Sequence, residues 1–270
     1  MTTARPWPVL RILPVGRYRG RSGALIERSL IVYGRSWIVL VSGALEPLLY
    51  LLAFQVGFGK LVTTVAGPDG RPMSYVAFVA PALLASSAMN GAVFETYNMF
   101  FKLRYAKHYD AVLATPVGPL DVALGEIGWA VLRGGLYTIA FMLVTAAMGL
   151  LTSWSALLLL PVALLVSFAF SAISMTLVSF LTSTSQLDYI QLVLMPMFLF
   201  STTFFPITVY PEAVQWVVRC FPLYHGIELM RGLAGGFFSW GMAGNLGYLV
   251  VLAAVGVWGA TRRIAKLLLH

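Results

Sequence analysis

Charged residues are scarce in this chain. Only 10% of its 270 residues are Asp, Glu, Lys or Arg, while 59% are hydrophobic. Soluble globular domains carry about 25% charged residues, so this composition cannot cover a water-exposed surface. It excludes an ordinary soluble protein and predicts a polytopic membrane protein.

The residue clusters that support catalysis are also missing. Cys220 is the single cysteine, which excludes an intramolecular disulfide. The three histidines stand far apart in the sequence, and neither H-E-x-x-H nor G-x-S-x-G occurs. The run "GFGK" at 57–60 lacks the upstream glycine of a phosphate loop, and Leu61 replaces its Ser or Thr. We expect no catalytic residue, no metal site and no cofactor bound by this chain.

Long hydrophobic runs are abundant. A membrane-spanning helix needs about 20 mostly apolar residues. Six stretches meet this requirement, at 36–58, 75–99, 122–150, 156–181, 189–207 and 241–261. The sequence therefore predicts an all-α integral membrane protein with a single domain over 1–270. It would comprise a cytoplasmic arm at 1–35, a six-span region at 36–261 and a cytoplasmic tail at 262–270.

The basic residues are unevenly distributed between the predicted loops. Thirteen lie before the first span, between spans two and three, or after span six, and four lie in the opposite loops. Arg133 lies inside span three and belongs to neither group. By the positive-inside rule, both termini are predicted to be cytoplasmic. The net charge of +8 is thus explained by topology and lipid contact, without nucleic acid.

Residues 21–35 alternate charged and apolar side chains, which is typical of an interfacial amphipathic helix on the inner leaflet.

Two carboxylates fall inside predicted spans. Glu46 is followed by Pro47, which kinks the helix, and is either a structural hydrogen-bonding group or part of a substrate path. Glu95 is expected to snorkel towards the membrane surface, or to pair with Lys102 or Arg104.

The segment at 201–233, "STTFFPITVYPEAVQWVVRCFPLYHGIELMRGL", is mostly apolar but is interrupted by prolines. The ten residues between Pro211 and Pro222 reach about 15 Å as a helix, half of a bilayer core. The pattern predicts an outer re-entrant hairpin of two short helices, with Glu228 and Arg231 paired at i,i+3. Arg231 either shapes a pathway exit or merely anchors at the headgroups.

The longest cytoplasmic loop lies between spans two and three. Residues 105–114 can form a short helix, which the Thr115-Pro116 step ends. Such a helix is either a plain surface helix or a segment that docks in a groove of a partner.

These motifs together resemble the ABC-2 type export permeases. The resemblance rests on Phe205-Pro206, Pro211, Pro222-Leu223 and Arg231-Gly232-Leu233, in that order. The stretches "EPLLYLLAF", "LATP", "LGE" and "FPLYHG" are similar to the branch that exports nodulation factors, which are lipo-chitooligosaccharides. The similarity covers nearly the whole chain beyond about residue 20.

The resemblance implies a half-permease in the plasma (inner) membrane that pairs with a second copy of itself or a related permease. A separate ATP-binding-cassette ATPase subunit, carrying ATP and Mg, would drive export of a lipo-oligosaccharide, glycolipid, polysaccharide or drug. The coupling residues implied are Arg104, Tyr105, His108, Tyr109, Asp110, Thr115 and Pro116. Path candidates are Glu46, Tyr50, Phe54, Tyr97 and Phe205, although aromatic residues at helical spacing are also typical of simple packing.

The competing interpretation is a stand-alone secondary transporter or channel, which usually carries more intramembrane ionisable residues.

Overall fold

The computed structural model describes residues 22–34, 37–57, 64–67, 70, 72–105, 119–151 and 153–268. Within the first two helices, the side chains of 24, 32–34, 37–44 and 46 are not described. The described chain is helical apart from turns and one small hairpin, in which β1 (Thr64–Ala66) pairs antiparallel with β2 (Pro72–Ser74). The predicted all-helical fold is confirmed to this extent.

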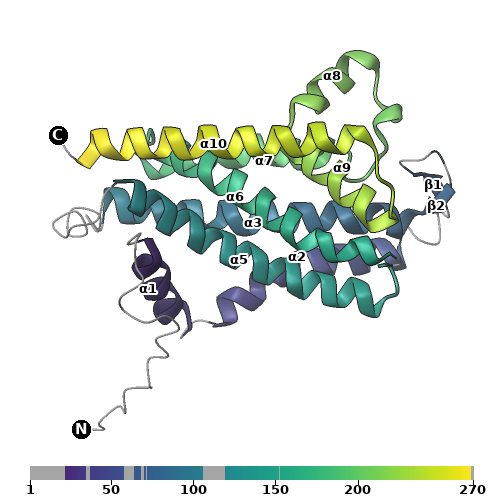
Figure 1. Cartoon of the computed structure of the whole chain (residues 1–270), viewed down its shortest axis with the longest axis horizontal. Coiled ribbons are helices and arrows are strands. Elements are labelled where there is room, and N and C mark those ends of the chain that lie inside the picture. The colour runs from purple at the N-terminus through teal and green to yellow at the C-terminus, as the bar shows by residue number, and fades with distance from the viewer. Residues whose placement is uncertain are drawn as a thin grey trace, which may run out of the picture.

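Four helices are long and apolar enough to cross a membrane. They are α3 (Tyr75–Arg104), α5 (Pro119–Ala147), α6 (Leu159–Val178) with the 3-10 turn η3 (Trp154–Leu158) before it, and α10 (Trp240–Leu268). They run side by side along the long axis of the molecule, with the β hairpin at one end and the end of α10 at the other (Figure 1). These four correspond to the predicted spans two, three, four and six.

The other two predicted spans are shorter or interrupted. The helix α2 (Trp37–Val56) contains Pro47, and α7 (Leu187–Phe200) contains Pro196. The predicted end of span five at Ile207 is wrong, because the helix stops at Phe200. Thr202 turns the chain there with a left-handed φ of 61°. Fourteen residues span about 21 Å, less than a hydrocarbon core of about 30 Å.

The remaining helices are short. At the end of the bundle near the end of α10, α1 (Ser22–Gly34) lies across the axis and packs on α5 (Figure 1). Two small turns, η4 (Thr184–Gln186) and η5 (Ile207–Val209), flank α7. The predicted pair of short helices after span five is present as α8 (Glu212–Cys220), whose N-cap is Pro211, and α9 (Pro222–Gly235), whose first residue is Pro222.

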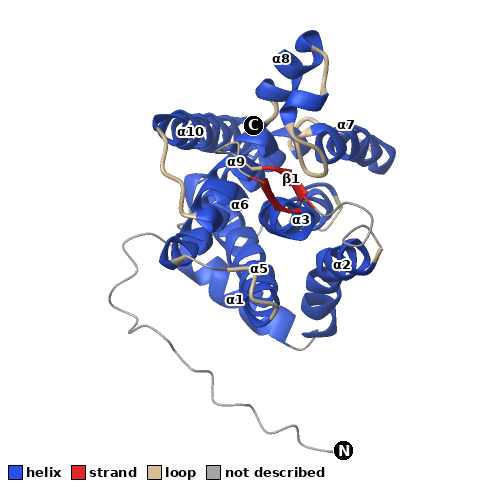
Figure 2. Cartoon of the chain, turned by 90° about the vertical axis from the view of Figure 1, so that its right-hand side faces the viewer, coloured by secondary structure: helices blue, strands red, loops and turns tan. Residues whose placement is uncertain are grey.

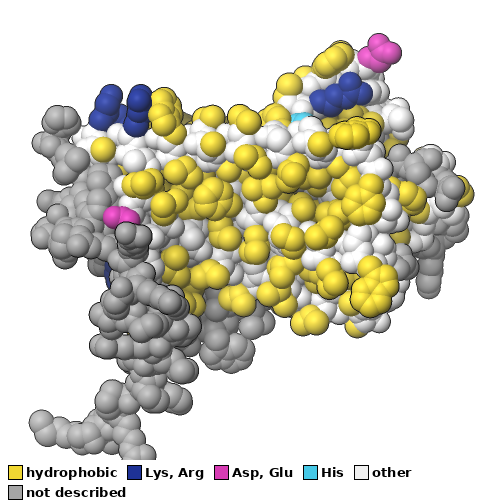
Figure 3. All heavy atoms as spheres, viewed as in Figure 1, with side chains coloured by type: hydrophobic (Ala, Val, Ile, Leu, Met, Phe, Trp, Pro, Cys, Tyr) yellow, Lys and Arg dark blue, Asp and Glu magenta, His cyan; other side chains and the backbone are white. Residues whose placement is uncertain are grey.

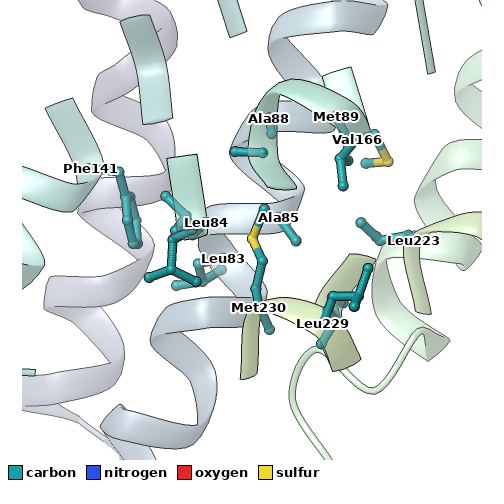
Figure 4. Packing of buried hydrophobic residues seen from close by; sticks show 14 of the residues in the cluster. Leu83, Leu84, Ala85, Ala88, Met89, Phe141, Val166, Leu223, Leu229 and Met230 are labelled. Carbon is teal, nitrogen blue, oxygen red and sulfur yellow. The ribbon is translucent and has the colours of Figure 1, made fainter. Parts of the chain in front are cut away.

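Viewed along the bundle from its β-hairpin end, α3 occupies the middle (Figure 2). It packs against α5 and α6 on one side and α9 on another, and most of its residues are buried. Leu83, Leu84 and Met89 of α3 meet Phe141 of α5, Val166 of α6, and Leu223, Leu229 and Met230 of α9 (Figure 4). Because α9 contributes to this core, it is an integral part of the bundle, whereas α8 projects beyond it (Figure 1).

Small residues bring three of these helices almost into backbone contact. A Cβ added to Gly91 of α3 would meet the Cα of Gly134 of α5 at 2.9 Å. A Cβ added to Gly134 would in turn collide with Ser167 of α6. The Ser167 hydroxyl donates a hydrogen bond of 2.9 Å to the carbonyl of Ala88 on α3. We call this contact the small-residue junction.

The molecular surface is mostly apolar along the bundle. On the face shown in Figure 3, hydrophobic side chains cover the middle, while basic side chains lie at the end of α10 and one more lies on α8. This distribution fits helices that meet lipid along their length and polar surroundings at their ends.

Candidate functional site: a groove between α2 and α7

A groove of about 320 Å³ lies between α2 and α7, with α3 as its floor. Its walls are mostly apolar. The lining residues are Pro47, Tyr50 and Phe54 of α2; Leu83, Ser86, Met89 and Asn90 of α3; Gln191, Leu194, Met195, Phe198 and Leu199 of α7; and Phe204.

Four aromatic rings form a cluster in this groove. Tyr50 lies 6.4 Å from Phe198, measured between ring centroids. Phe204 lies 5.3 Å from Phe198 in an edge-on arrangement and 5.1 Å from Phe54. These contacts join α2 to α7, and both helices to the turn that follows α7, through aromatic side chains.

The polar groups of the groove are few. The Ser86 hydroxyl donates 2.9 Å to the carbonyl of Ala82, so its proton is used within α3. Asn90 is exposed near the middle of α3, and Gln191 is exposed on α7. Their amides can both donate and accept hydrogen bonds. A mostly apolar groove with two neutral amides suits a ligand that is largely apolar and carries some hydroxyl or amide groups.

Tyr50 and Phe54, predicted as path residues, both line this groove. Tyr97 does not line the groove; its ring packs beside Phe94, with ring centroids 6.5 Å apart. Phe205 is 53% exposed and does not line the groove either, whereas its neighbour Phe204 does. The side chain of Glu46 lies outside the described residues. Sequence reasoning missed Phe198 and Asn90, although their helical spacing with Leu194 and Ser86 carried a weak signal.

Next to the groove, a chain of buried charges joins α3 to α5. An Arg133 Nη1 donates to Glu95 Oε2 at 2.9 Å, and both side chains are almost fully buried. The Arg133 Nε donates to the Tyr137 hydroxyl at 2.9 Å, and the guanidinium lies 4.7 Å from the centroid of the Phe94 ring. Arg133 therefore has a partner within the membrane region that the sequence did not reveal.

The same chain continues towards the end of α3. Lys102 lies 3.9 Å from Glu95 and donates 2.7 Å to Glu126 of α5. Pairing of Glu95 with Lys102 is confirmed, but snorkelling of Glu95 and its pairing with Arg104 are wrong. Burial removes the water that a snorkelling carboxylate needs, and Arg104 instead donates from Nε to the carbonyl of Leu181 at 2.9 Å.

Arg104 and Tyr105 are the only predicted coupling residues in the part of the chain that the structure describes. Arg104 ties the end of α3 to the end of α6, and Tyr105 is 62% exposed. His108, Tyr109, Asp110, Thr115 and Pro116 lie outside the described residues.

Arg231 occupies the centre of the contact between α9 and α3. Its Nη1 donates 2.9 Å to Glu228, which confirms the predicted i,i+3 pair. Its Nη2 donates 2.7 Å to the carbonyl of Thr202, its Nε donates 3.3 Å to the carbonyl of Phe78, and its guanidinium lies 3.7 Å from the Phe78 ring centroid. Burial lowers the pKa of the Arg231 guanidinium, and the Glu228 carboxylate opposes this shift.

The headgroup anchor considered for Arg231 is therefore wrong. An anchor would be exposed at the molecular surface, whereas Arg231 is only 3% exposed. Its three donor nitrogens all have partners within the protein: Nε and Nη2 donate to main-chain carbonyls, and Nη1 donates to the Glu228 carboxylate. Arg231 thus fixes the position of the Thr202 turn, which is followed by the groove residue Phe204. Pro206 follows this turn as the N-cap of η5.

Comparisons with known proteins match most of the chain. A sequence profile described as ABC-2 type transporter matches residues 22–234. Nodulation protein J of Rhizobium meliloti (strain 1021) is 34% identical over 212 residues, covering 77% of this chain and 79% of the relative. Nodulation protein J of Rhizobium leguminosarum bv. trifolii is 31% identical over 251 residues, covering 92% and 94%. The probable doxorubicin resistance ABC transporter permease protein DrrC of Mycobacterium tuberculosis is 22% identical over 217 residues, covering 78% and 75%.

Proposed function

Because this chain belongs to the ABC-2 type transporter family, we propose that it is the permease subunit of an ATP-binding-cassette exporter. In this role it moves an amphipathic substrate outward across the plasma membrane. The family and the apolar helices make it a multi-pass membrane protein that serves transport rather than catalysis. The observation that carries the finer proposal is the aromatic groove between α2 and α7, whose lining suits a lipid-like molecule.

The substrate that fits this groove has an apolar portion and neutral polar groups. Lipo-oligosaccharides, glycolipids, polysaccharides and hydrophobic drugs are the candidate classes. The groove contains no charged side chain among its described lining residues, which favours the neutral members of these classes. Similarity to proteins named for nodulation and for doxorubicin resistance supports the same range.

We place the energy source on another chain. A cytoplasmic ATPase subunit holds ATP and Mg and docks on the segment at 105–115. Arg104 supports this assignment, because its bond to the Leu181 carbonyl joins the beginning of that segment to the end of α6. The Lys102, Glu126, Glu95 and Arg133 chain then continues from the same end into the core between α3 and α5.

A second copy of this chain, or a related permease, completes the pathway. The helices α2 and α7, which form the walls of the groove, also expose large apolar side chains. They include Leu45, Leu49, Tyr50, Leu52 and Val56 on α2, and Tyr189, Leu192, Val193, Met195, Leu199 and Phe200 on α7. Pairing of these surfaces around a two-fold axis would bring two grooves together into one path.

The orientation that we propose has both termini in the cytoplasm, six spans including α2 and α7, and the β hairpin outside. In this orientation α1 lies on the inner leaflet and α8 with α9 forms the re-entrant hairpin of the outer leaflet. The Thr202–Arg231 contact then stands near the exit.

Co-purification tests the proposal. The chain is expressed with the ATPase subunit of its own source, and a tag on the permease is used for purification. We expect a stable complex whose ATP hydrolysis drives accumulation of a fluorescent glycolipid in inside-out vesicles. Accumulation that follows a proton or sodium gradient without any ATPase would establish the secondary transporter instead, and ion conductance would establish a channel.

A further inference from the structure

A second hollow, of about 660 Å³, lies between α6 and α10 near the end of α10. It is distinct from the groove, because no residue lines both. Its mouth carries Arg262, Arg263 and Lys266, and its wall includes Phe180, Trp258 and Ile173. In Figure 3, the basic spheres at the end of α10 lie directly beside hydrophobic ones.

The bottom of this hollow is set by close packing of the two helices. A Cβ added to Gly256 would meet the backbone of Ala172 at 2.7 Å, and one added to Gly259 would meet Thr176 at 2.8 Å. The Thr176 hydroxyl donates 2.8 Å to the carbonyl of Gly256. The helices are therefore held together below the hollow, and larger side chains surround its opening.

Aromatic rings hold two of the three cations in place. The Arg262 guanidinium lies 4.3 Å from the centroid of Trp258, and that of Arg263 lies 4.3 Å from the centroid of Phe180. Cation–π contacts orient a guanidinium without neutralising its charge.

No acid balances these charges in the described part of the chain. The lining contains three cations and no Asp or Glu, and no described acidic side chain lies within ion-pair distance of them. The buried Arg263 Nε has no hydrogen-bond partner among the described residues. The hollow thus presents three uncompensated positive charges above an apolar wall.

We infer that this hollow binds one anionic phospholipid of the inner leaflet, with the phosphate at Arg262, Arg263 and Lys266 and an acyl chain along Ile173 and Val255. The position supports a lipid, because the wall belongs to two membrane helices and the cations stand at their ends. Basic pockets between membrane helices on the cytoplasmic side suit such headgroups. The leaflet, but not the binding, rests on the proposed orientation.

Native mass spectrometry of the purified full-length chain tests this inference. Phosphatidylglycerol and phosphatidylcholine are added separately, and the bound fraction is titrated. We expect one tightly held phosphatidylglycerol and no matching phosphatidylcholine. A triple variant replaces all three cations by glutamine (Arg262→Gln, Arg263→Gln, Lys266→Gln). It should bind phosphatidylglycerol at least about tenfold more weakly, because each basic side chain attracts the anionic headgroup.

Arg219→Gln is the matched control for Arg262→Gln. Arg219 is also exposed and stacked on a tryptophan, 5.4 Å from the centroid of Trp216, but it belongs to α8 and lines no part of the hollow. It should leave phosphatidylglycerol binding unchanged, whereas Arg262→Gln alone should weaken it. Circular dichroism and the thermal midpoint establish that each variant is folded.

Three results would overturn the inference. The first is equal binding of both lipids, and the second is equal binding by the triple variant and wild type. The third is binding of inorganic phosphate alone as tightly as phosphatidylglycerol, which would make the phosphate group sufficient without the apolar wall. If the triple variant retains phosphatidylglycerol but loses its ATPase partner, the cations form a protein-binding surface instead. Because lipid binding is measured without transport, its failure leaves the exporter proposal intact.

Discussion

The guanidinium of Arg133 on α5 donates 2.9 Å to the carboxylate of Glu95 on α3, in a region where neither side chain meets solvent. Two opposite charges are thus satisfied inside helices that are long and apolar enough to span a membrane. Isolated, either charge would cost about 2.5–3.5 kcal/mol at a bilayer centre on insertion scales. Their contact is a structural link that the proposed motor segment, a few residues beyond Lys102, can act upon.

Removing one partner of this pair should be costly. We expect Glu95→Ala to destabilise the protein by about 3–5 kcal/mol, because the buried Arg133 would lose the carboxylate that its Nη1 contacts. The double variant Glu95→Leu, Arg133→Leu should recover most of that loss, since neither charge remains. Thermal midpoints in one detergent measure both. Glu212→Ala, at an exposed carboxylate of α8, is the milder control. Equal midpoints for Glu95→Ala and wild type would contradict the structural role.

Arg231 should matter for folding as well as for export. Arg231→Ala removes the hydrogen bonds that Arg231 donates to Glu228, Phe78 and Thr202, and the loss of its donor to the Thr202 carbonyl costs about 1–3 kcal/mol. Arg231→Lys should recover only part of this, because lysine lacks the planar fork. The measurements are assembled complex per cell and export rate per complex. Export at the wild-type rate by assembled Arg231→Ala would separate this residue from the exit.

The coupling assignment predicts a different failure. Changing Tyr109 and Asp110 together to Ala should leave the chain folded but uncouple ATP hydrolysis by the partner from export. Stimulated ATPase activity and transport are measured on the same vesicles, with Asp69→Ala on the opposite predicted side as the control. If both activities keep their wild-type values, 105–115 is not the docking segment.

The topology can be read by cysteine labelling. Cys220 is exposed, so it is first replaced by Ser. A cysteine introduced at position 69 should then react with a membrane-impermeant maleimide added outside intact cells, and one at position 110 only after permeabilisation. Labelling of position 69 solely from the cytoplasmic side would invert the proposed orientation.

Obstruction of the groove should block export selectively. Met195 lines the groove and is 69% exposed, while Leu143 of α5, 67% exposed, lines a separate hollow beside η3. We expect Met195→Trp to reduce export per assembled complex to a small fraction of wild type, and Leu143→Trp to leave it nearly unchanged. Comparable export by the two variants would remove the groove from the substrate path.

Most of the helices were predictable, because a membrane helix can be recognised in the sequence as a long apolar run. The spans at 75–99, 122–150, 156–181 and 241–261 each have a helix within a few residues, except that α10 continues to Leu268. The proline positions also placed α8 and α9 correctly. The prediction failed at the end of α7, because the left-handed turn at Thr202 is fixed by a bond to Arg231, which lies 29 residues away.

The site was less predictable for the same reason. Helical spacing put Tyr50 and Phe54 on one face, but it could not say that Phe204 rather than Phe205 turns inward. Nor could it pair Glu95 with Arg133, because partners on different helices depend on how the helices rotate and pack. A lone intramembrane arginine was the available signal, and searching for a buried carboxylate at matching depth would have found Glu95.

The small-residue junction of Gly91, Gly134 and Ser167 bears on how such a machine can move. At this junction the helices approach so closely that no flexible side chains separate their backbones. Such close packing has low compressibility, so a displacement of one helix displaces its neighbours. We expect α3, α5 and α6 to travel as one stiff body during a transport stroke. We expect the movement to occur at α2 and α7, whose Tyr50 and Phe198 rings contact each other across the groove. A single methyl group added at Gly134 would collide with Ser167 and push α5 away from α6. We therefore expect Gly134→Ala to lower the export rate, while the groove residues and the ATPase partner stay unchanged.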